Sequence, residues 1–127
     1  MAAAPPRSPP KTDLTGAHAH RMPSLMDTLT RLAATIAARR DADPATSWVA
    51  KLNQRGVRVI ARKLGEEAVE TIVAALSGSR EELVGEAADV LFHLLVLLDA
   101  KGVPLEEVMA ELERREGTSG IAEKAAR

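Results

Sequence analysis

The sequence predicts an all-α fold built around an antiparallel pair of helices. No segment alternates apolar and polar residues as a half-buried strand does, whereas apolar residues recur every three or four positions through much of the chain. Glycine and proline interrupt this helical pattern at a few places and divide the chain into helices joined by short turns. At 127 residues, the chain suits one domain.

The composition excludes several classes of function. The net charge of −1 gives no sign of a protein that binds nucleic acid or a charged membrane surface. Cysteine is absent, which excludes disulfides, thiolate zinc sites and a cysteine nucleophile, and a cytoplasmic location fits this composition. The longest apolar run, at 90–98, is far shorter than the ~20 residues that span a bilayer. We therefore expect neither a nucleic-acid partner nor a membrane.

The first part of the chain is rich in alanine and proline and lacks apolar periodicity. We expect a disordered tail at 1–23 and one folded domain at 24–127. Ser24 suits the N-cap of the first helix, in which apolar residues recur at helical spacing as far as Arg39.

The middle of the chain predicts a helical hairpin. Pro44 breaks the first pattern, and a short helix is expected at about 47–53, before Gly56. A long helix follows, and its apolar residues form one stripe: Val57, Ile60, Ala61, Leu64, Ala68, Ile72 and Ala75. Gly78 is expected to end this helix, and Ser79 to cap the next one. Two long helices joined by so short a turn run antiparallel.

The helix after the turn is expected at about 80–101, and it is apolar nearly all round beyond Ala87. A helix of this kind must be buried on several sides, inside a bundle or a dimer. Gly102 and Pro104 end it, a last helix is expected at about 105–115, and the remaining residues are expected to trail off without structure. The predicted architecture is thus a hairpin-centred bundle that dimerisation completes.

Four carboxylates are expected to face one another across the hairpin. Glu67 and Glu70 lie three residues apart at the edge of the packing face, whereas Glu66 points to water. Glu86 and Asp89 repeat this spacing on the following helix. Counted from the turn glycine, Glu70 and Glu86 both lie eight residues away. Glu67 and Asp89 both lie eleven residues away, so the two pairs can face each other at equal heights.

Carboxylates gathered in this way need compensation. Four like charges at one level repel strongly in a low dielectric, and either protonation or a divalent cation relieves that repulsion. Asp89 lies in the most apolar helix of the chain, where a bare carboxylate is costly. An all-oxygen ligand set favours Mg²⁺ or Mn²⁺ over zinc, and bound Mg²⁺ commonly handles phosphates. The alternative is a solvated charged face with salt bridges to Arg62 or Lys63.

Two further side chains lie near the carboxylates. Lys63 precedes Glu67 by one turn and could meet a phosphate, or it could form an i,i+4 pair with Glu67. His93 follows Asp89 by one turn and could support a ligand or donate to a phosphate, or it could be a core histidine. The sequence has no Gly-rich phosphate loop and no Ser/His/Asp arrangement, so covalent catalysis has no support.

The residues just described also carry a family resemblance. The chain resembles the phosphoribosyl-ATP pyrophosphohydrolases, which belong to the MazG-like all-α nucleoside triphosphate pyrophosphatases, in "SWVAKL", "GVRVIARKLGEEAVETIVAAL" and "EAADVLFHLLVLL". The resemblance covers about 25–127 and includes the ending "LERREGTSGIAEKAAR". The family motif of two acidic i,i+3 pairs falls on Glu67, Glu70, Glu86 and Asp89, and these positions hold Mg²⁺ in the wider superfamily.

The resemblance implies a MazG-like bundle that hydrolyses the α–β phosphoanhydride of phosphoribosyl-ATP with Mg²⁺. The products would be phosphoribosyl-AMP and pyrophosphate, in the second step of histidine biosynthesis. The resemblance makes the four carboxylates the metal ligands and catalytic residues, and one of them would activate the attacking water; which one stays open. It also implies a homodimer, with helices of both subunits around each site.

The resemblance extends to the residues expected to bind the substrate. Lys51 and Lys63 fall at basic positions of the family pattern and are expected to hold phosphates, or they are ordinary surface lysines. Trp48 and His93 complete the expected substrate-binding set. The family usually has tyrosine where this chain has Trp48 and Phe92, so both rings are kept here and both hydroxyls are lost.

Two other functions stay open. A house-cleaning pyrophosphatase of the same superfamily, acting on dCTP or on non-standard nucleotides, would use the same four carboxylates, and a substrate panel would distinguish it. A non-catalytic helical dimerisation module would show no metal dependence and would tolerate Asp89→Ala.

Overall fold

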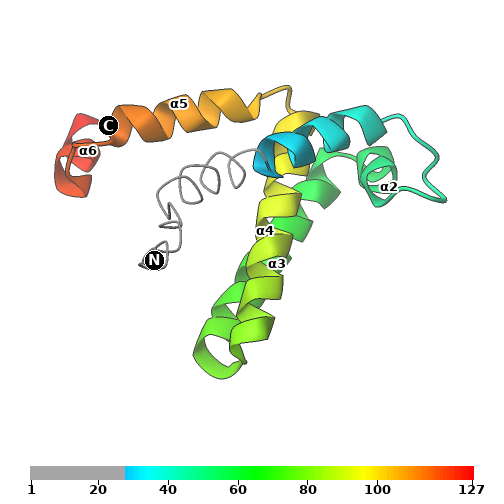
Figure 1. The fold of residues 1–127 in the computed structure, drawn as a ribbon, viewed down its shortest axis with the longest axis horizontal. Helices are drawn as coiled ribbons and strands as arrows, with labels where there is room; N and C mark the ends of the chain where they lie inside the picture. The colour runs from blue at the N-terminus through cyan, green and yellow to red at the C-terminus, as the bar shows by residue number, and fades with distance from the viewer. Residues whose placement is uncertain (1–27) are drawn as a thin grey trace, which may run out of the picture.

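The structure is a computed structural model that describes residues 28–127, apart from the side chain of Glu123. All regular structure in the described range is helical, which confirms the predicted all-α fold class (Figure 1). The expected tail at 1–23 and the expected N-cap at Ser24 lie outside the described residues. None of the helices that are described has the length and apolar character needed to cross a membrane.

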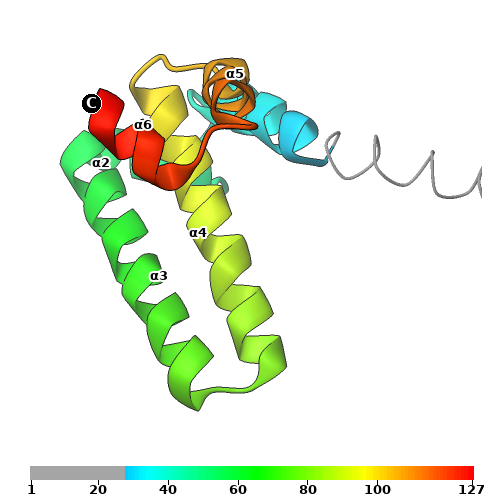
Figure 2. The same cartoon turned by 90° about the vertical axis from the view of Figure 1, so that its left-hand side faces the viewer.

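A helix over 28–39 opens the described chain. After it come α2 (Trp48–Arg55), α3 (Val57–Ser77), α4 (Arg80–Ala100), α5 (Leu105–Arg115) and α6 (Gly120–Ala126). Helices α3 and α4 pack along each other as the predicted antiparallel hairpin, and α2 lies against α3 (Figures 1 and 2).

Helix α6 corrects the sequence analysis, which expected no structure after Arg115. Ser119 caps it: its Oγ accepts a hydrogen bond from the backbone N–H of Ala122 at 3.1 Å. The seven residues of α6 contain a single large apolar side chain, Ile121, so the sequence has no apolar periodicity that would predict this helix.

The hairpin turn depends on a close approach at Gly78. This residue ends α3 in an extended conformation, with φ −99° and ψ −178°, instead of the left-handed one common after a helix. A Cβ at Gly78 would lie 3.0 Å from the backbone of Ala74, a contact so tight that the turn favours glycine here. Ser79 caps α4 as predicted, because its Oγ accepts from the N–H of Glu82 at 3.1 Å.

The apolar core lies at the end of the hairpin that is remote from the turn. The largest fully buried side chains there are Ile36, Leu52, Ile60 and Val96. They come from four different helices, so the core joins the helix over 28–39 and α2 to the base of the hairpin. In the turn half, at 69–90, only Ala74 is buried.

An ion pair fixes the segment before α2 to the end of α4. Arg40 donates from Nε to Asp99 Oδ2 at 2.9 Å and from Nη2 to Oδ1 at 2.6 Å. A carboxylate near a helix C-terminus is disfavoured by the helix dipole, and the guanidinium compensates for it. The contact therefore ties the end of the helix over 28–39 to the end of α4.

The apolar stripe predicted for α3 is partly wrong. Ile60 is buried as expected, but Ile72 is 59% exposed. The inward face of α3 is rotated toward Glu67 relative to the predicted stripe, because Ile60 and Ala74 are its buried residues and Glu67 is half-buried between them. Glu67 therefore faces α4. Large apolar side chains face the solvent instead, and we call the following four residues the outer stripe: Val69, Ile72, Val73 and Leu76. On α4, Val84 and Leu91 are exposed too, so the all-round burial expected for α4 is not reached within one chain.

Candidate functional site

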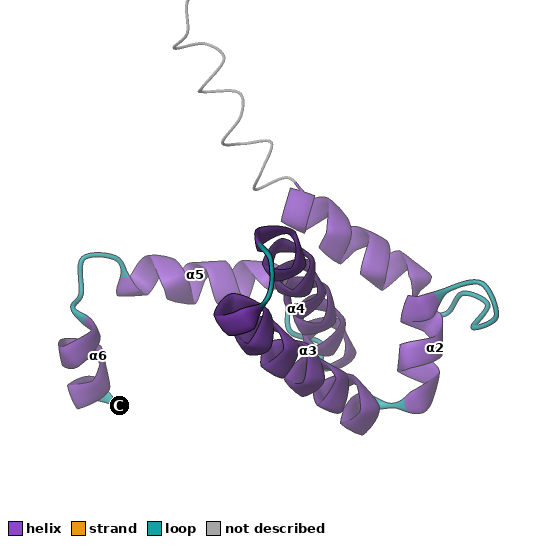
Figure 3. Cartoon of the chain, turned by 90° about the horizontal axis from the view of Figure 1, so that it is seen from below, coloured by secondary structure: helices purple, strands orange, loops and turns teal. Residues whose placement is uncertain are grey.

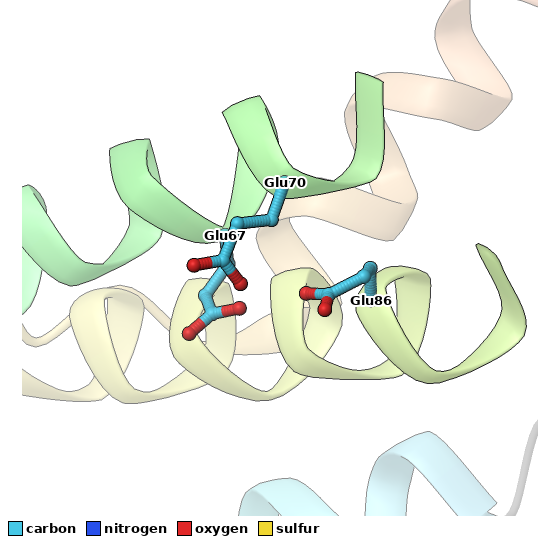
Figure 4. Close-up of side chains that lie close together, drawn as sticks. All are labelled: Glu67, Glu70 and Glu86. Carbon is cyan, nitrogen blue, oxygen red and sulfur yellow. The ribbon is translucent and has the colours of Figure 1, made fainter. Parts of the chain in front are cut away.

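Three carboxylates meet in the middle of the hairpin (Figure 4). Glu67 and Glu70 come from α3 and Glu86 comes from α4, and each offers an oxygen within 4.8 Å of the other two. Their i,i+3 spacing on α3 puts Glu67 and Glu70 on neighbouring turns of one face, and the short turn sets the height of Glu86.

Two oxygens of this carboxylate cluster are enclosed. Glu67 Oε2 and Glu86 Oε2 are buried and have no hydrogen-bond partner among the described residues. Buried acceptors are normally paired, so these oxygens favour a cation or a proton between α3 and α4. Glu70 is the exposed member of the cluster and marks its open side.

Asp89, the fourth predicted ligand, lies one turn further along α4 and outside this group of three. Counting from the turn glycine placed Glu67 opposite Asp89. The structure instead brings both Glu67 and Glu70 close to Glu86. Asp89 is exposed, although it lies on the most apolar helix of the chain. Its charge nevertheless raises the pKa of Glu67, after the larger effect of burial, so Asp89 borders the cluster.

The crowding changes the protonation of the cluster. Burial, followed by contacts with Glu70 and Glu67 and by their charges, raises the pKa of Glu86 from 4.5 to about 7. The pKa of Glu67 is raised as well, chiefly by burial, although a hydrogen bond with Glu86 acts in the opposite direction. Near neutral pH the metal-free cluster therefore holds a proton where a cation would also fit.

We predict that the metal-free protein loses stability as the pH rises. A carboxyl group with a raised pKa binds more protons folded than unfolded between its unfolded pKa of about 4.3 and its folded pKa. For Glu86 this window ends at about 7, so the free energy of unfolding should fall between those values and then level off. Urea titrations in EDTA at a series of pH values measure the effect.

The matched variant is Glu86→Gln, which should flatten this pH dependence and raise the metal-free stability above pH 7. The control is Glu81→Gln, because Glu81 is exposed on the same helix. Equal slopes for Glu86→Gln and the wild type would contradict the crowding described above.

The salt bridges expected for a solvated charged face are formed by Glu66. Lys63 Nζ lies 3.3 Å from Glu66 Oε2, and Arg62 Nε lies 3.7 Å from Glu66 Oε1. The structure thus pairs Lys63 with Glu66 rather than with Glu67, and it leaves the half-buried lysine one turn from the cluster. Exposed pairs of this kind contribute little, so Lys63 can exchange Glu66 for another anion.

His93 is buried on α4, one turn beyond Asp89. Its Nδ1 lies 2.7 Å from the backbone oxygen of Asp89, to which it can donate, and its Nε2 is enclosed without a partner among the described residues. Its ring meets Phe92 edge-on, with ring centroids 5.2 Å apart. These contacts are those of a core histidine that supports the turn carrying Asp89.

Two of the predicted substrate-binding residues, Trp48 and Lys51, lie on the outer face of α2 and not in the cluster. Trp48 is 42% exposed, and the guanidinium of Arg55 lies 5.9 Å from its ring centroid. The sequence analysis missed Arg55, although its i,i+7 spacing from Trp48 could have indicated the contact.

Comparison with known proteins gives a consistent result. The family model described as "Phosphoribosyl-ATP pyrophosphohydrolase" matches residues 29–116. A phosphoribosyl-ATP pyrophosphatase from Erythrobacter litoralis (strain HTCC2594) is 66% identical over 102 residues, which are 80% of this chain and 98% of the relative. A protein of the same name from Novosphingobium aromaticivorans is 68% identical over 99 residues, 78% of this chain and 92% of the relative.

Proposed function

We propose, since the chain belongs to the phosphoribosyl-ATP pyrophosphohydrolase family, that it hydrolyses phosphoribosyl-ATP. The proposed site is the carboxylate cluster of Glu67, Glu70 and Glu86. The α–β phosphoanhydride is cleaved, and the products are phosphoribosyl-AMP and pyrophosphate, as histidine biosynthesis requires. The observation that carries the proposal is the convergence of one oxygen from each of the three carboxylates within 4.8 Å of the others, on two neighbouring helices.

We propose that Glu67, Glu70, Glu86 and Asp89 hold Mg²⁺, with Mn²⁺ as a substitute. The donor set fits, because it is all oxygen and includes two buried oxygens that have no hydrogen-bond partner in the described part of the chain. Bound Mg²⁺ offsets the charge of the triphosphate and of the leaving pyrophosphate.

We assign the remaining roles, which are water activation, phosphate binding and positioning of α4, to side chains of the chain itself. Glu70 is the member of the cluster open to solvent, and we assign it to orient the attacking water and to accept its proton. Lys63 leaves Glu66 and binds a phosphate oxygen one turn away from Glu67. His93 keeps the turn of α4 that carries Asp89 in place through its hydrogen bond to the backbone.

We further propose that the enzyme acts in the cytoplasm as a homodimer. Each chain exposes large apolar side chains along α3 and α4, and a second chain would bury them. Lys51 and Trp48, on the outer face of α2, are then candidates for contact with the parts of the substrate remote from the anhydride.

The proposal is tested by pyrophosphate release. Purified protein is expected to release pyrophosphate from phosphoribosyl-ATP with added Mg²⁺ and to lose this activity in EDTA. ATP and dCTP serve as comparison substrates, and both should be cleaved much more slowly. Faster cleavage of dCTP would assign a house-cleaning role instead, and the absence of release from every substrate would refute the enzymatic function.

A further inference from the structure

The two ends of the helical hairpin carry opposite charge. Residues 44–65, which include α2 and the start of α3, have five basic side chains and no acidic one. Residues 66–89, which include the carboxylate cluster and the turn, have seven acidic side chains and one basic side chain. The basic end lies at the base of the hairpin, where α2 packs beside the start of α3 (Figures 2 and 3). An anion is therefore attracted to this end of the hairpin.

Arg55 is held in a defined position at the basic end. It is the last residue of α2, and its Cζ atom lies 5.9 Å from the ring centroid of Trp48, the first residue of the same helix. A separation of less than about 6 Å is that of a cation–π contact. The two residues are about 10 Å apart along the helix axis, so the Arg55 side chain extends back along α2 to reach the ring. We call these two residues the Trp48–Arg55 pair.

The rest of α2 gives this pair a fixed support. Val49, Ala50 and Leu52 are buried, so the helix cannot turn about its axis without exposing them. Ser47 Oγ accepts a hydrogen bond from the N–H of Ala50 at 3.3 Å, and the N–H of Gly56 donates to the carbonyl oxygen of Leu52 at 3.1 Å. The pair is therefore in position before any ligand arrives, which lowers the entropic cost of binding.

The guanidinium of Arg55 keeps its hydrogen-bond donors for a ligand. A cation–π contact uses the charge of the group and none of its five N–H groups. Among the described residues, no carboxylate or carbonyl oxygen pairs with the Arg55 side chain, whereas Arg62 pairs with Glu66. Trp48 is 42% exposed and Arg55 is exposed as well, so the pair is open to solvent. A planar guanidinium with free donors matches a phosphate group, which it can bind through two parallel hydrogen bonds.

The proposed substrate has one phosphate group that lies far from the bond to be cleaved. Phosphoribosyl-ATP carries its triphosphate on the ribose at N9 of adenine and a separate 5′-phosphate on the second ribose, at N1. Two ribose rings and the purine therefore lie between its two phosphorylated ends. Gly56, next to Arg55, and Glu67 of the cluster are about 16 Å apart along α3, which is the order of length of such a molecule. Lys63, one turn from Glu67, is close enough to the cluster to serve the triphosphate instead.

We propose that Arg55, positioned by Trp48, binds the 5′-phosphate of the N1 phosphoribosyl group and so distinguishes phosphoribosyl-ATP from ATP. The proposal rests on the proposed function for the identity of the substrate, and it adds a second binding site outside the carboxylate cluster. ATP lacks this phosphate, so a contact here favours only the larger nucleotide. Tryptophan gives the strongest cation–π contact of the aromatic residues, so the indole of Trp48 suits this role without the tyrosine hydroxyl.

The first test measures binding without hydrolysis. Phosphoribosyl-AMP and AMP contain no phosphoanhydride, and they differ only in the phosphoribosyl group. Isothermal titration calorimetry with Mg²⁺ should show that the wild type binds phosphoribosyl-AMP more tightly than AMP. Arg55→Ala should reduce this preference by about 10-fold or more. Arg55→Lys keeps the charge but loses the planar fork, so it should lose most of the preference as well. A preference that survives in either variant would overturn the proposal.

The matched control is Arg58→Ala, which removes an exposed arginine at the same basic end. Nine residues separate Arg58 from Glu67, so the two side chains lie on opposite sides of α3. Arg58→Ala should keep the preference within about threefold of the wild type, because a single exposed charge acts weakly in salt. Equal losses in Arg58→Ala and Arg55→Ala would indicate a general attraction to the basic end and would overturn the specific site.

Trp48 allows the position of the ligand to be checked directly, because it is the only tryptophan in the chain. Its fluorescence should change on titration with phosphoribosyl-AMP, and far less with AMP at equal occupancy. Trp48→Leu, which removes the cation–π contact and keeps an apolar side chain, should lower the preference measured by calorimetry several-fold. Unchanged fluorescence with phosphoribosyl-AMP bound would overturn the role of the Trp48–Arg55 pair.

The last test separates this proposal from the proposed function. Arg55→Ala should lower the ratio of kcat/KM for phosphoribosyl-ATP to kcat/KM for ATP by about 10-fold or more, since only the larger substrate reaches Arg55. A loss of the same factor for both substrates would place Arg55 at the triphosphate and overturn the proposal. If no substrate releases pyrophosphate while the binding of phosphoribosyl-AMP depends on Arg55, the proposed function fails and the binding site stands.

Discussion

Glu67→Gln, Glu70→Gln, Glu86→Gln and Asp89→Asn should each lower pyrophosphate release from phosphoribosyl-ATP by about 100-fold or more. Each substitution removes one negative oxygen donor from the proposed Mg²⁺ site and changes the side-chain volume very little. Glu66→Gln is the matched control, because Glu66 lies on the same helix and pairs with Arg62 and Lys63 outside the cluster. Its rate should stay within about threefold of the wild type, since exposed ion pairs contribute little.

Stability measurements on the same five variants separate the loss of a ligand from the loss of the fold. In EDTA, each of the four carboxylate variants should be as stable as the wild type or more stable, since it removes one of the charges that crowd Glu67 and Glu86, whose pKa values are raised chiefly by burial. If Glu66→Gln proves as inactive as Glu67→Gln, the orientation of α3 is wrong. If all five variants keep their activity, the carboxylates have no part in the reaction.

Leu52→Ala is expected to have the largest effect on the free energy of unfolding. Leu52 is fully buried on α2, at the point where α2 joins the core at the base of the hairpin. Removing a buried leucine side chain costs about 2–5 kcal/mol, a large share of the roughly 5–15 kcal/mol that keeps a domain folded. Urea unfolding followed by circular dichroism measures the change.

The control for Leu52→Ala is Gln54→Ala, two residues further along the same helix, where the side chain is exposed. A surface substitution of this kind should change the free energy of unfolding by no more than about 0.5 kcal/mol. Equal costs at the two positions would mean that α2 does not pack on the hairpin as described.

Most of the helical framework could be predicted from the sequence, because the residues that begin and end each helix act locally. Gly56, the pair Gly78–Ser79 and Pro104 mark helix boundaries within one or two residues of those in the structure. Counting along the hairpin predicted Glu70 opposite Glu86, and both belong to the cluster, whereas Glu67, which was predicted opposite Asp89, also lies near Glu86. Helix α6 escaped prediction because it is capped by Ser119 alone and carries almost no apolar pattern.

Features that depend on distant parts of the chain could not be predicted. The apolar residues of α3 form a band wide enough for several orientations, and only the positions of α2 and α4 decide that Ile60 is buried and Ile72 is exposed. The exposure of Asp89 follows from the same choice. The contact between Arg40 and Asp99 joins residues 59 positions apart, and no periodicity in the sequence indicates it.

The turn at Gly78 has a consequence for how the chain can change in length. The carboxylates of α3 and α4 meet because this one tight turn fixes the heights of the two helices relative to each other. One residue inserted between Glu70 and Gly78 would rotate the α3 carboxylates by about 100° and shift them by about 1.5 Å relative to Glu86. Insertions and deletions within 67–89 should therefore be selected against, even though most side chains in this range are exposed. The loop after Arg40, in contrast, can change in length without altering the spacing of the cluster.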